Sequence, residues 1–136
     1  MGLDYGTKRI GVAMSDELLL TAQGSKTIFN NTASESIAVI AGLVKSSGVA
    51  EVIIGLPVSM NGSHSQKTKE VIAFAEELMK ALPVPVKTWD ERLTTAQAER
   101  ALLEADMSRS KRKRLNDMVA AQLILQGYLD HRKKGL

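Results

Sequence analysis

The chain has 136 residues, of which 44% are hydrophobic and 24% are charged, and it contains no cysteine. This length suits one domain with a real core and is too short for two, so we expect a single domain over residues 1–136. The composition excludes disulfides and a thiolate zinc site, and no apolar run is long enough to span a membrane. Because a signal-peptide pattern is also lacking, we expect a cytoplasmic protein with no membrane partner.

The formal net charge of +3 hides an asymmetry along the chain. Residues 109–136 carry eight Lys and Arg side chains against two Asp, whereas residues 1–108 carry ten basic side chains against thirteen acidic ones. This concentration of basic residues favours a polyanionic partner at one edge of the molecule. A solvated charge run is the alternative interpretation of the same residues.

The first third of the chain predicts three strands followed by a helix. Short apolar runs separated by turn residues predict an antiparallel meander of strands near 2–5, 10–14 and 18–29. The turn at Asn30-Asn31-Thr32 offers an N-cap for a helix near 33–46, and Gly48 is its stop signal.

Strands and helices alternate in the middle of the chain. A β-branched apolar run predicts a strand over 50–54, and a helix near 66–81 follows a polar loop. We expect its capping box to consist of Ser63 and Gln66. The segment 83–89 is the next predicted strand, with its prolines confined to its start.

Two further helices complete the predicted elements. Thr94 with Gln97 suits a capping box for a helix near 95–105, and the last helix runs from about 114 to 131 after a basic stretch. Because helices alternate with strands, right-handed crossovers and a parallel half-sheet are required. We therefore predict an α/β fold, a mixed five-stranded sheet of three antiparallel then parallel strands with helices on both faces.

Three acidic sites stand out against this pattern. Asp4 lies in the middle of a buried strand, where a lone carboxylate costs several kcal/mol unless it is compensated. Asp117 lies on the apolar face of the last helix, which should face the sheet, although an acid favoured by the helix dipole is the simpler alternative. Asp90 and Glu91 end the last strand, where a loop pair neutralised by Arg92 is the alternative.

Carboxylates that converge at one end of a sheet repel one another, and a divalent cation makes such a cluster stable. With oxygen ligands and no thiolate, the expected ion is Mg²⁺ or Mn²⁺. Such ions catalyse phosphodiester hydrolysis, which predicts a nucleic-acid substrate. The same substrate accounts for the basic cluster ahead of Asp117, which consists of Arg109, Lys111, Arg112, Lys113 and Arg114.

Four segments are similar, in order and nearly end to end, to the YqgF/RuvX family. They are GLDYGTKRIGVAMSD, VIIGLPVSMNGS, DERLTT and KRLNDMVAAQLILQGYL. The resemblance implies an RNase H-like fold related to RuvC-type Holliday-junction resolvases. It also implies a bacterial nuclease that processes the 5′ end of pre-16S rRNA in the cytoplasm.

Carried over by motif, the catalytic and metal-binding acids are Asp4, Glu91 and Asp117, with Asp90 as the alternative metal ligand on the last strand. RuvC-like enzymes carry an acid at the end of the fourth strand, whereas this chain has Gly55-Leu56-Pro57 there. The Asp90-Glu91-Arg92 segment must therefore substitute for it. Lys8, Arg9 and Arg92 join the basic cluster as expected nucleic-acid contacts, although a solvated hairpin tip explains Lys8 and Arg9 equally well.

Three other functions compete with processing of structured RNA. One is a Holliday-junction resolvase acting on branched DNA, which requires a dimer that the sequence does not predict. Another is a ribosome-assembly factor that binds nucleic acid without cleaving it. The third is a phosphotransferase, because GLDYGT also resembles the first phosphate motif of sugar kinases and actin-like ATPases. Those proteins bind nucleotide between two such domains, and this chain supplies one.

Overall fold

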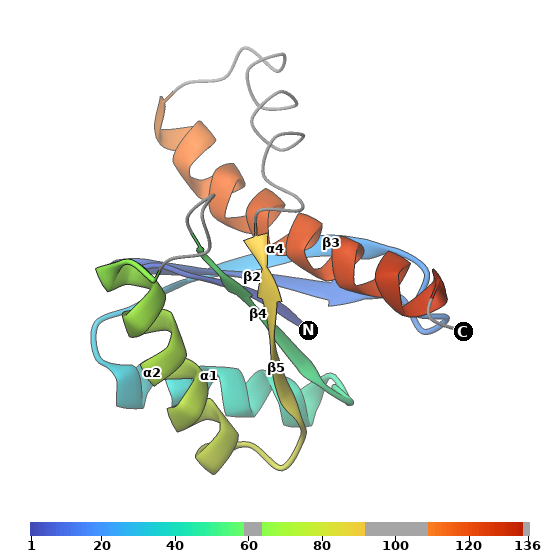
Figure 1. The fold of residues 1–136 in the computed structure, drawn as a ribbon, viewed down its shortest axis with the longest axis horizontal. Coiled ribbons are helices and arrows are strands. Elements are labelled where there is room, and N and C mark those ends of the chain that lie inside the picture. The colour runs from blue at the N-terminus through green and yellow to red at the C-terminus, as the bar shows by residue number, and fades with distance from the viewer. Residues whose placement is uncertain (59–63, 92–108, 135–136) are drawn as a thin grey trace.

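In the computed structural model, the structure describes residues 1–58, 64–91 and 109–134, and the side chains of the last range from Asp117 to Arg132. Five strands form one sheet: β1 (Gly2–Tyr5), β2 (Arg9–Ser15), β3 (Ala22–Phe29), β4 (Val52–Leu56) and β5 (Val86–Asp90). Three helices pack against it: α1 (Ala33–Ser46), α2 (Gln66–Ala81) and α4 (Arg109–Lys134) (Figure 1). The expected helix near 95–105, with its cap at Thr94 and Gln97, lies outside the described residues.

The sheet has the strand order β3-β2-β1-β4-β5. β2 pairs antiparallel with both β1 and β3, whereas β4 pairs parallel with both β1 and β5. The predicted mixed sheet is therefore confirmed. Parallel pairing places the carboxyl ends of β1, β4 and β5 at one edge, where open α/β sheets bind ligands.

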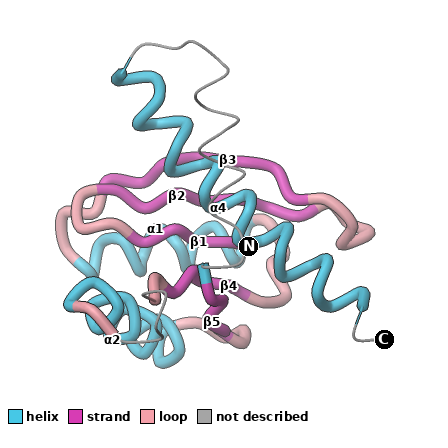
Figure 2. Tube along the Cα trace, turned by 45° about the horizontal axis from the view of Figure 1, so that its top comes forward, coloured by secondary structure: helices cyan, strands magenta, loops and turns pink. Residues whose placement is uncertain are grey.

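Helices α1 and α2 cover one face of the sheet (Figure 2). Leu3, Val12 and Ile54 of the strands pack there with Ile40 of α1 and Leu78 of α2, all of them essentially inaccessible to solvent. Both helices have the predicted bounds. Thr32 caps α1 as expected, and Gly48, with a φ of +61°, follows its end.

The cap of α2 differs from the prediction. Ser65, rather than Ser63, accepts a hydrogen bond from the backbone N–H of Thr68, and the Thr68 hydroxyl completes the capping box. The prediction chose the wrong serine because Thr68 can close the box as well as Gln66 can. Thr68 is fully buried and also donates to the carbonyl of Pro57, which ties the start of α2 to the segment after β4.

Helix α4 covers the opposite face of the sheet, where Ile124 and Leu125 pack on Ala13 and Ile53. It crosses β2 closely, since a Cβ at Gly11 would collide with the carbonyl oxygen of Asp117. The helix begins at Arg109, five residues before the predicted start, so the basic stretch belongs to it. Arginine and lysine are good helix formers. The prediction placed the helix start too late because this stretch has no apolar periodicity. No helix among the described residues is long and apolar enough to cross a membrane.

Three strands are displaced from their predicted limits. β4 starts at Val52, two residues later than predicted, and β5 starts at Val86, three residues later than predicted. β3 begins at Ala22, so the predicted strand over 18–29 is wrong in its first four residues. There the Asp16 carboxylate accepts hydrogen bonds from the backbone N–H groups of Leu20 and Thr21, which closes a loop instead of extending a strand.

Candidate active site

Because side chains alternate between the two faces of the sheet along each strand, three strand positions face α4. Leu3 points into the core beneath α1 and α2, so Asp4 points to the opposite face, where it lies opposite Gly11 of β2. On β4, Ile53 and Gly55 share this face. Glu91 directly follows β5, and its side chain lies beside α4 over Gly55, at the carboxyl end of the sheet.

Glu91 occupies the space that Gly55 leaves free. A Cβ at Gly55 would lie 2.5 Å from Oε1 of Glu91 and would also collide with Ile124 of α4. The carboxyl group of Glu91 therefore sits over the end of β4. This is the strand end at which the sequence has Gly55-Leu56-Pro57 in place of the expected acid.

The side chains of Asp4 and Glu91 are hydrogen-bonded to each other. Burial is the largest cause that raises the pKa of Asp4, to about 7, and the charges of Glu91 and Asp117 raise it further. Burial also raises the pKa of Glu91. Two carboxyl groups this close cannot both ionise freely, so without a cation they retain a proton between them near neutral pH.

Asp117 is held apart from this pair. Its Oδ2 accepts a hydrogen bond from Nε of Arg9 at 2.8 Å, in an ion pair whose side chains are 31% and 21% exposed. Among the described residues, no three acidic or histidine side chains are close enough together to form a metal site as they stand. The structure thus brings Asp4 and Glu91 together and leaves Asp117 beside them, engaged by Arg9.

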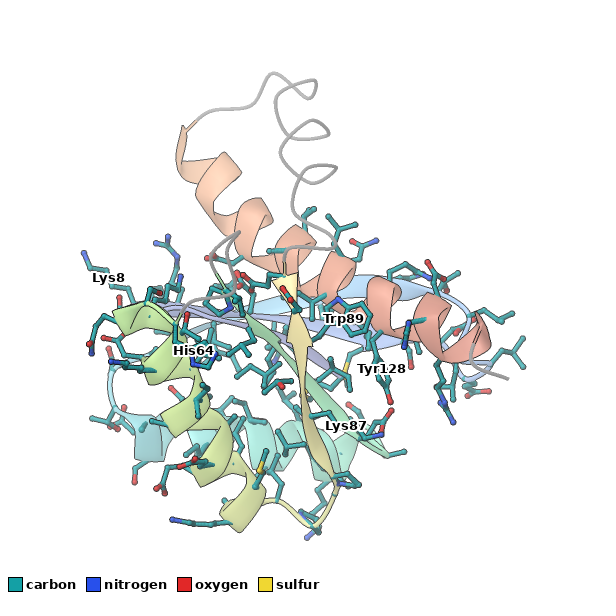
Figure 3. The ribbon with its side chains drawn as sticks, in the orientation of Figure 1. Lys8, His64, Lys87, Trp89 and Tyr128 are labelled. Atoms are coloured by element: carbon teal, nitrogen blue, oxygen red, sulfur yellow. The ribbon has the colours of Figure 1, made fainter. Side chains whose placement is uncertain are left out.

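The turn between β1 and β2, which carries Lys8 and leads into Arg9, is anchored by Asn30. The Nδ2 of Asn30 donates to the carbonyl of Gly6 at 2.9 Å, and its backbone N–H donates to the carbonyl of Lys8 at the same distance. The buried hydroxyl of Ser36 donates to Oδ1 of Asn30. Lys8 is exposed at this turn (Figure 3).

Sequence reasoning missed Lys67, in the first turn of α2. Its positive charge lowers the pKa of both Asp4 and Glu91, which places its ammonium group within electrostatic reach of the pair. The contact between Thr68 and Pro57 holds this turn at the carboxyl end of β4. The available signal was a lysine in the first turn of a helix, where the helix dipole disfavours a cation.

The remaining predicted residues are only partly described. Asp90 ends β5 beside Glu91, and its charge raises the pKa of Glu91. Arg92 lies outside the described residues, and of the basic cluster at 109–114 only the helical backbone is described. Trp89 packs at the edge of the core against Tyr128, with ring centroids 6.1 Å apart (Figure 3). His64 is exposed.

The donor set fits a hard divalent cation. Asp4 and Glu91 offer carboxylate oxygens at one place, which suits Mg²⁺ or Mn²⁺ better than softer metals. A cation there would replace the proton that the two groups share. Asp117 could join them only if Arg9 released it, so as it stands the site offers two adjacent carboxyl groups and a third held in an ion pair.

Comparison with solved structures defines the class of fold. The chain matches Thermus thermophilus RuvC, solved in complex with a Holliday junction substrate, with a TM-score of 0.61 at 15% identity, over 98% of this chain and 94% of that one. It matches the fowlpox virus resolvase, solved with Holliday junction DNA, with a TM-score of 0.54 at 11% identity, over 96% of each chain. The fold is thus the RNase H-like fold of RuvC.

Sequence comparison identifies the family. Residues 1–131 match the family described as "RuvX: Holliday junction resolvase", and this chain belongs to that family. A relative from Halothermothrix orenii is 52% identical over 98% of this chain and 96% of its own length, and one from Moorella thermoacetica is 52% identical over 96% and 93%. Both carry the name "Putative pre-16S rRNA nuclease".

Proposed function

We propose that this chain is a metal-dependent endonuclease that hydrolyses phosphodiester bonds in structured RNA, with the 5′ end of the 16S rRNA precursor as its substrate. The observation that carries the nuclease function is the partly buried, hydrogen-bonded pair of Asp4 and Glu91 at the carboxyl edge of an RNase H-like sheet. The shared name of the relatives supports the RNA substrate. Such a protein would work in the cytoplasm, as one nuclease domain.

Asp4 and Glu91 are the residues that would hold Mg²⁺ or Mn²⁺, with Asp117 completing the set and Asp90 as the alternative to Glu91. When bound, the ion supplies activation of a water molecule and stabilisation of charge at the phosphorus centre. The two carboxyl groups are partly shielded from solvent, and Glu91 packs over Gly55 beside α4. This placement by the fold would favour the transition state over the ground state once a cation is bound.

The cations around the pair would bind the substrate backbone. Lys8 is exposed beside the site and Lys67 faces it from α2, so both can contact phosphates on either side of the cleaved bond. The basic cluster at 109–114 would add further phosphate contacts. The residues proposed to contact nucleic acid are Lys8, Arg9, Arg92, Arg109, Lys111, Arg112, Lys113 and Arg114.

A Holliday-junction resolvase is the second candidate, favoured by the description of the family and by the DNA complexes of the structural neighbours. Symmetrical cleavage of a junction needs two active sites and hence a dimer. A ribosome-assembly factor that binds RNA without cleaving it is the third. A phosphotransferase would bind Mg-ATP, which a thermal-shift titration detects.

One experiment separates these functions. Purified protein is incubated with a transcript that contains the 5′ leader and start of 16S rRNA, and in parallel with a four-way DNA junction, in Mn²⁺ and in EDTA. We expect Mn²⁺-dependent cleavage of the transcript in its leader, and none with Asp4→Asn. Symmetrical cleavage of the junction alone would indicate a resolvase. Tight binding of the transcript without cleavage by the wild type would indicate an assembly factor.

A further inference from the structure

The loop between β2 and β3 displays three consecutive leucines. Leu18 is 75% exposed, and Leu19 and Leu20 are each 40% exposed. They account for three of the six exposed large hydrophobic side chains among the described residues. Since β2 starts at Arg9 beside the candidate active site and ends at Ser15, this leucine loop (residues 16–21) lies at the other end of the sheet (Figure 2).

The leucines are held in place rather than loosely exposed. Asp16 accepts backbone hydrogen bonds from Leu20 at 2.8 Å and from Thr21 at 3.2 Å. Gln126 of α4 clamps the loop from the side, since its Nε2 donates to the carbonyl of Leu20 and its Oε1 accepts from the N–H of Ala22. Leu19 adopts a φ of +59°, a left-handed conformation that disfavours any side chain. The fold thus maintains both exposure and strain at this loop.

A hollow of about 550 Å³ opens beside the loop. Its walls come from the leucine loop, from the connection between α1 and β4, and from the C-terminal half of α4. Leu19 lines it together with Met14, Leu125 and Leu129, so apolar side chains of a partner could be buried there. Exposed leucines beside an apolar hollow are typical of a protein-binding surface.

The charges around this surface indicate which kind of partner it would bind. Asp16 and Glu17 adjoin the leucines. Asp130 lies beside Gln126 and accepts a hydrogen bond from it at 3.0 Å. At the wall of the hollow, the described basic groups are Arg132 and the N-terminal ammonium of Met1, against the acidic Asp16, Glu17 and Glu51, so the border is acidic on balance. This acidic border would repel nucleic acid and anionic membranes, although the whole chain carries a net charge of +3.

We propose that the leucine loop and the hollow beside it form a docking surface for a protein segment in which large apolar side chains alternate with lysine or arginine. The apolar side chains would pack on Leu18 and Leu20 and enter the hollow, while the cations would meet Glu17 and Asp130. The surface is separate from the candidate active site, so the proposal does not depend on the nuclease function.

The test measures binding of a short peptide in which leucine alternates with lysine, with its leucine–glutamate counterpart as the control, by fluorescence anisotropy. The double variant Leu18→Ser/Leu20→Ser should bind the leucine–lysine peptide at least about tenfold more weakly than wild type. Phe29→Ser should bind like wild type, since Phe29 is 76% exposed but lies at the far end of β3. Glu17→Gln/Asp130→Asn should also weaken binding, whereas Glu76→Gln/Glu77→Gln on α2 should not.

Leu19→Gly separates folding from binding. Glycine relieves the left-handed strain, so this variant should melt no lower than wild type and yet bind the peptide more weakly. Equal peptide affinity in wild type and in the leucine variants would overturn the proposal, as would equal or tighter binding of the leucine–glutamate peptide. Two further results would assign the surface to another occupant and overturn it: a dimer in light scattering that Leu18→Ser/Leu20→Ser dissociates, or leucine-dependent binding to vesicles of anionic phospholipid.

Discussion

The guanidinium of Arg9, at the start of β2, holds the carboxylate of Asp117 on α4 with a distance of 2.8 Å between Nε and Oδ2. The two residues are 108 positions apart in the chain, and their side chains are 31% and 21% exposed to solvent. This ion pair neutralises Asp117, which we propose as the third metal ligand. Cation binding at the proposed site would therefore compete with Arg9 for this carboxylate.

Arg9→Gln should release Asp117. The loss of a partly exposed ion pair should cost about 0.5–1 kcal/mol of unfolding free energy at low salt, and less at high salt. In the absence of nucleic acid, the variant should bind Mn²⁺ more tightly than wild type, which isothermal calorimetry measures. Lys8→Gln is the matched control, because it removes a neighbouring exposed cation and leaves the ion pair intact. If both variants bind Mn²⁺ like wild type, Asp117 is not a ligand in competition with Arg9.

Asp4→Asn should remove a pH dependence from the stability of the metal-free protein. Because burial and neighbouring carboxylates raise the pKa of Asp4 to about 7, folding favours its protonated form. Its contribution to stability is complete below about pH 4 and is lost as the pH rises through about 7. In EDTA near pH 8, the variant should be as stable as wild type or about 1–2 kcal/mol more stable. Urea unfolding at acidic and alkaline pH measures this; equal destabilisation at both would indicate a structural acid.

Glu91→Gln should weaken both the response to metal and cleavage. Mn²⁺ should raise the melting temperature of wild type, since an ion bound only by the folded protein stabilises it, and raise that of the variant much less. Cleavage of the RNA transcript should fall by roughly a hundredfold or more. Asp90→Asn is the control that decides between the two acids after β5. A larger loss of cleavage with Asp90→Asn than with Glu91→Gln would show that Asp90, rather than Glu91, is the metal ligand after β5.

Gly55→Ala should displace the Glu91 carboxyl group. The added Cβ would lie 2.5 Å from Oε1 of Glu91, too close for any side chain to tolerate without moving. We expect a strong loss of cleavage together with a destabilisation of about 1–3 kcal/mol from overpacking. Gly42→Ala in α1 is the matched control, since nothing lies within 4 Å of its added Cβ, and it should stabilise the protein by up to about 1 kcal/mol. Wild-type cleavage by Gly55→Ala would show that the position of Glu91 is immaterial.

The basic cluster at the start of α4 should control binding rather than chemistry. Replacing Lys111, Arg112, Lys113 and Arg114 with alanine should reduce the slope of log affinity against log salt by about 3–4 on duplex nucleic acid. Cleavage at saturating substrate should change little, because none of the four is proposed to touch the reacting atoms. Filter binding over a range of salt concentrations measures the slope. An unchanged slope would mean that the cluster is a solvated helix face.

Local patterns determined most of the architecture from the sequence alone. Apolar alternation and helical periodicity predicted all five strands and the bounds of α1 and α2, and the Thr32 cap was correct. The buried carboxylate in GLDY and the acids after β5 marked the candidate site. These features could be predicted because period, capping and the cost of burying a charge depend on neighbours within a few residues.

Only the tertiary structure decided how the acids meet. The position of Glu91 over Gly55 depends on the spacing of β4, β5 and α4, and the pairing of Arg9 with Asp117 depends on the close crossing of α4 over Gly11. Lys67 reaches the site because Thr68 binds the carbonyl of Pro57. Leu18–Leu20 are as apolar as a strand, yet they form an exposed loop because the Asp16 carboxylate accepts a hydrogen bond from the N–H of Leu20 and Gln126 donates one to its carbonyl. Each outcome depends on contacts between segments distant in the chain, which no local pattern encodes.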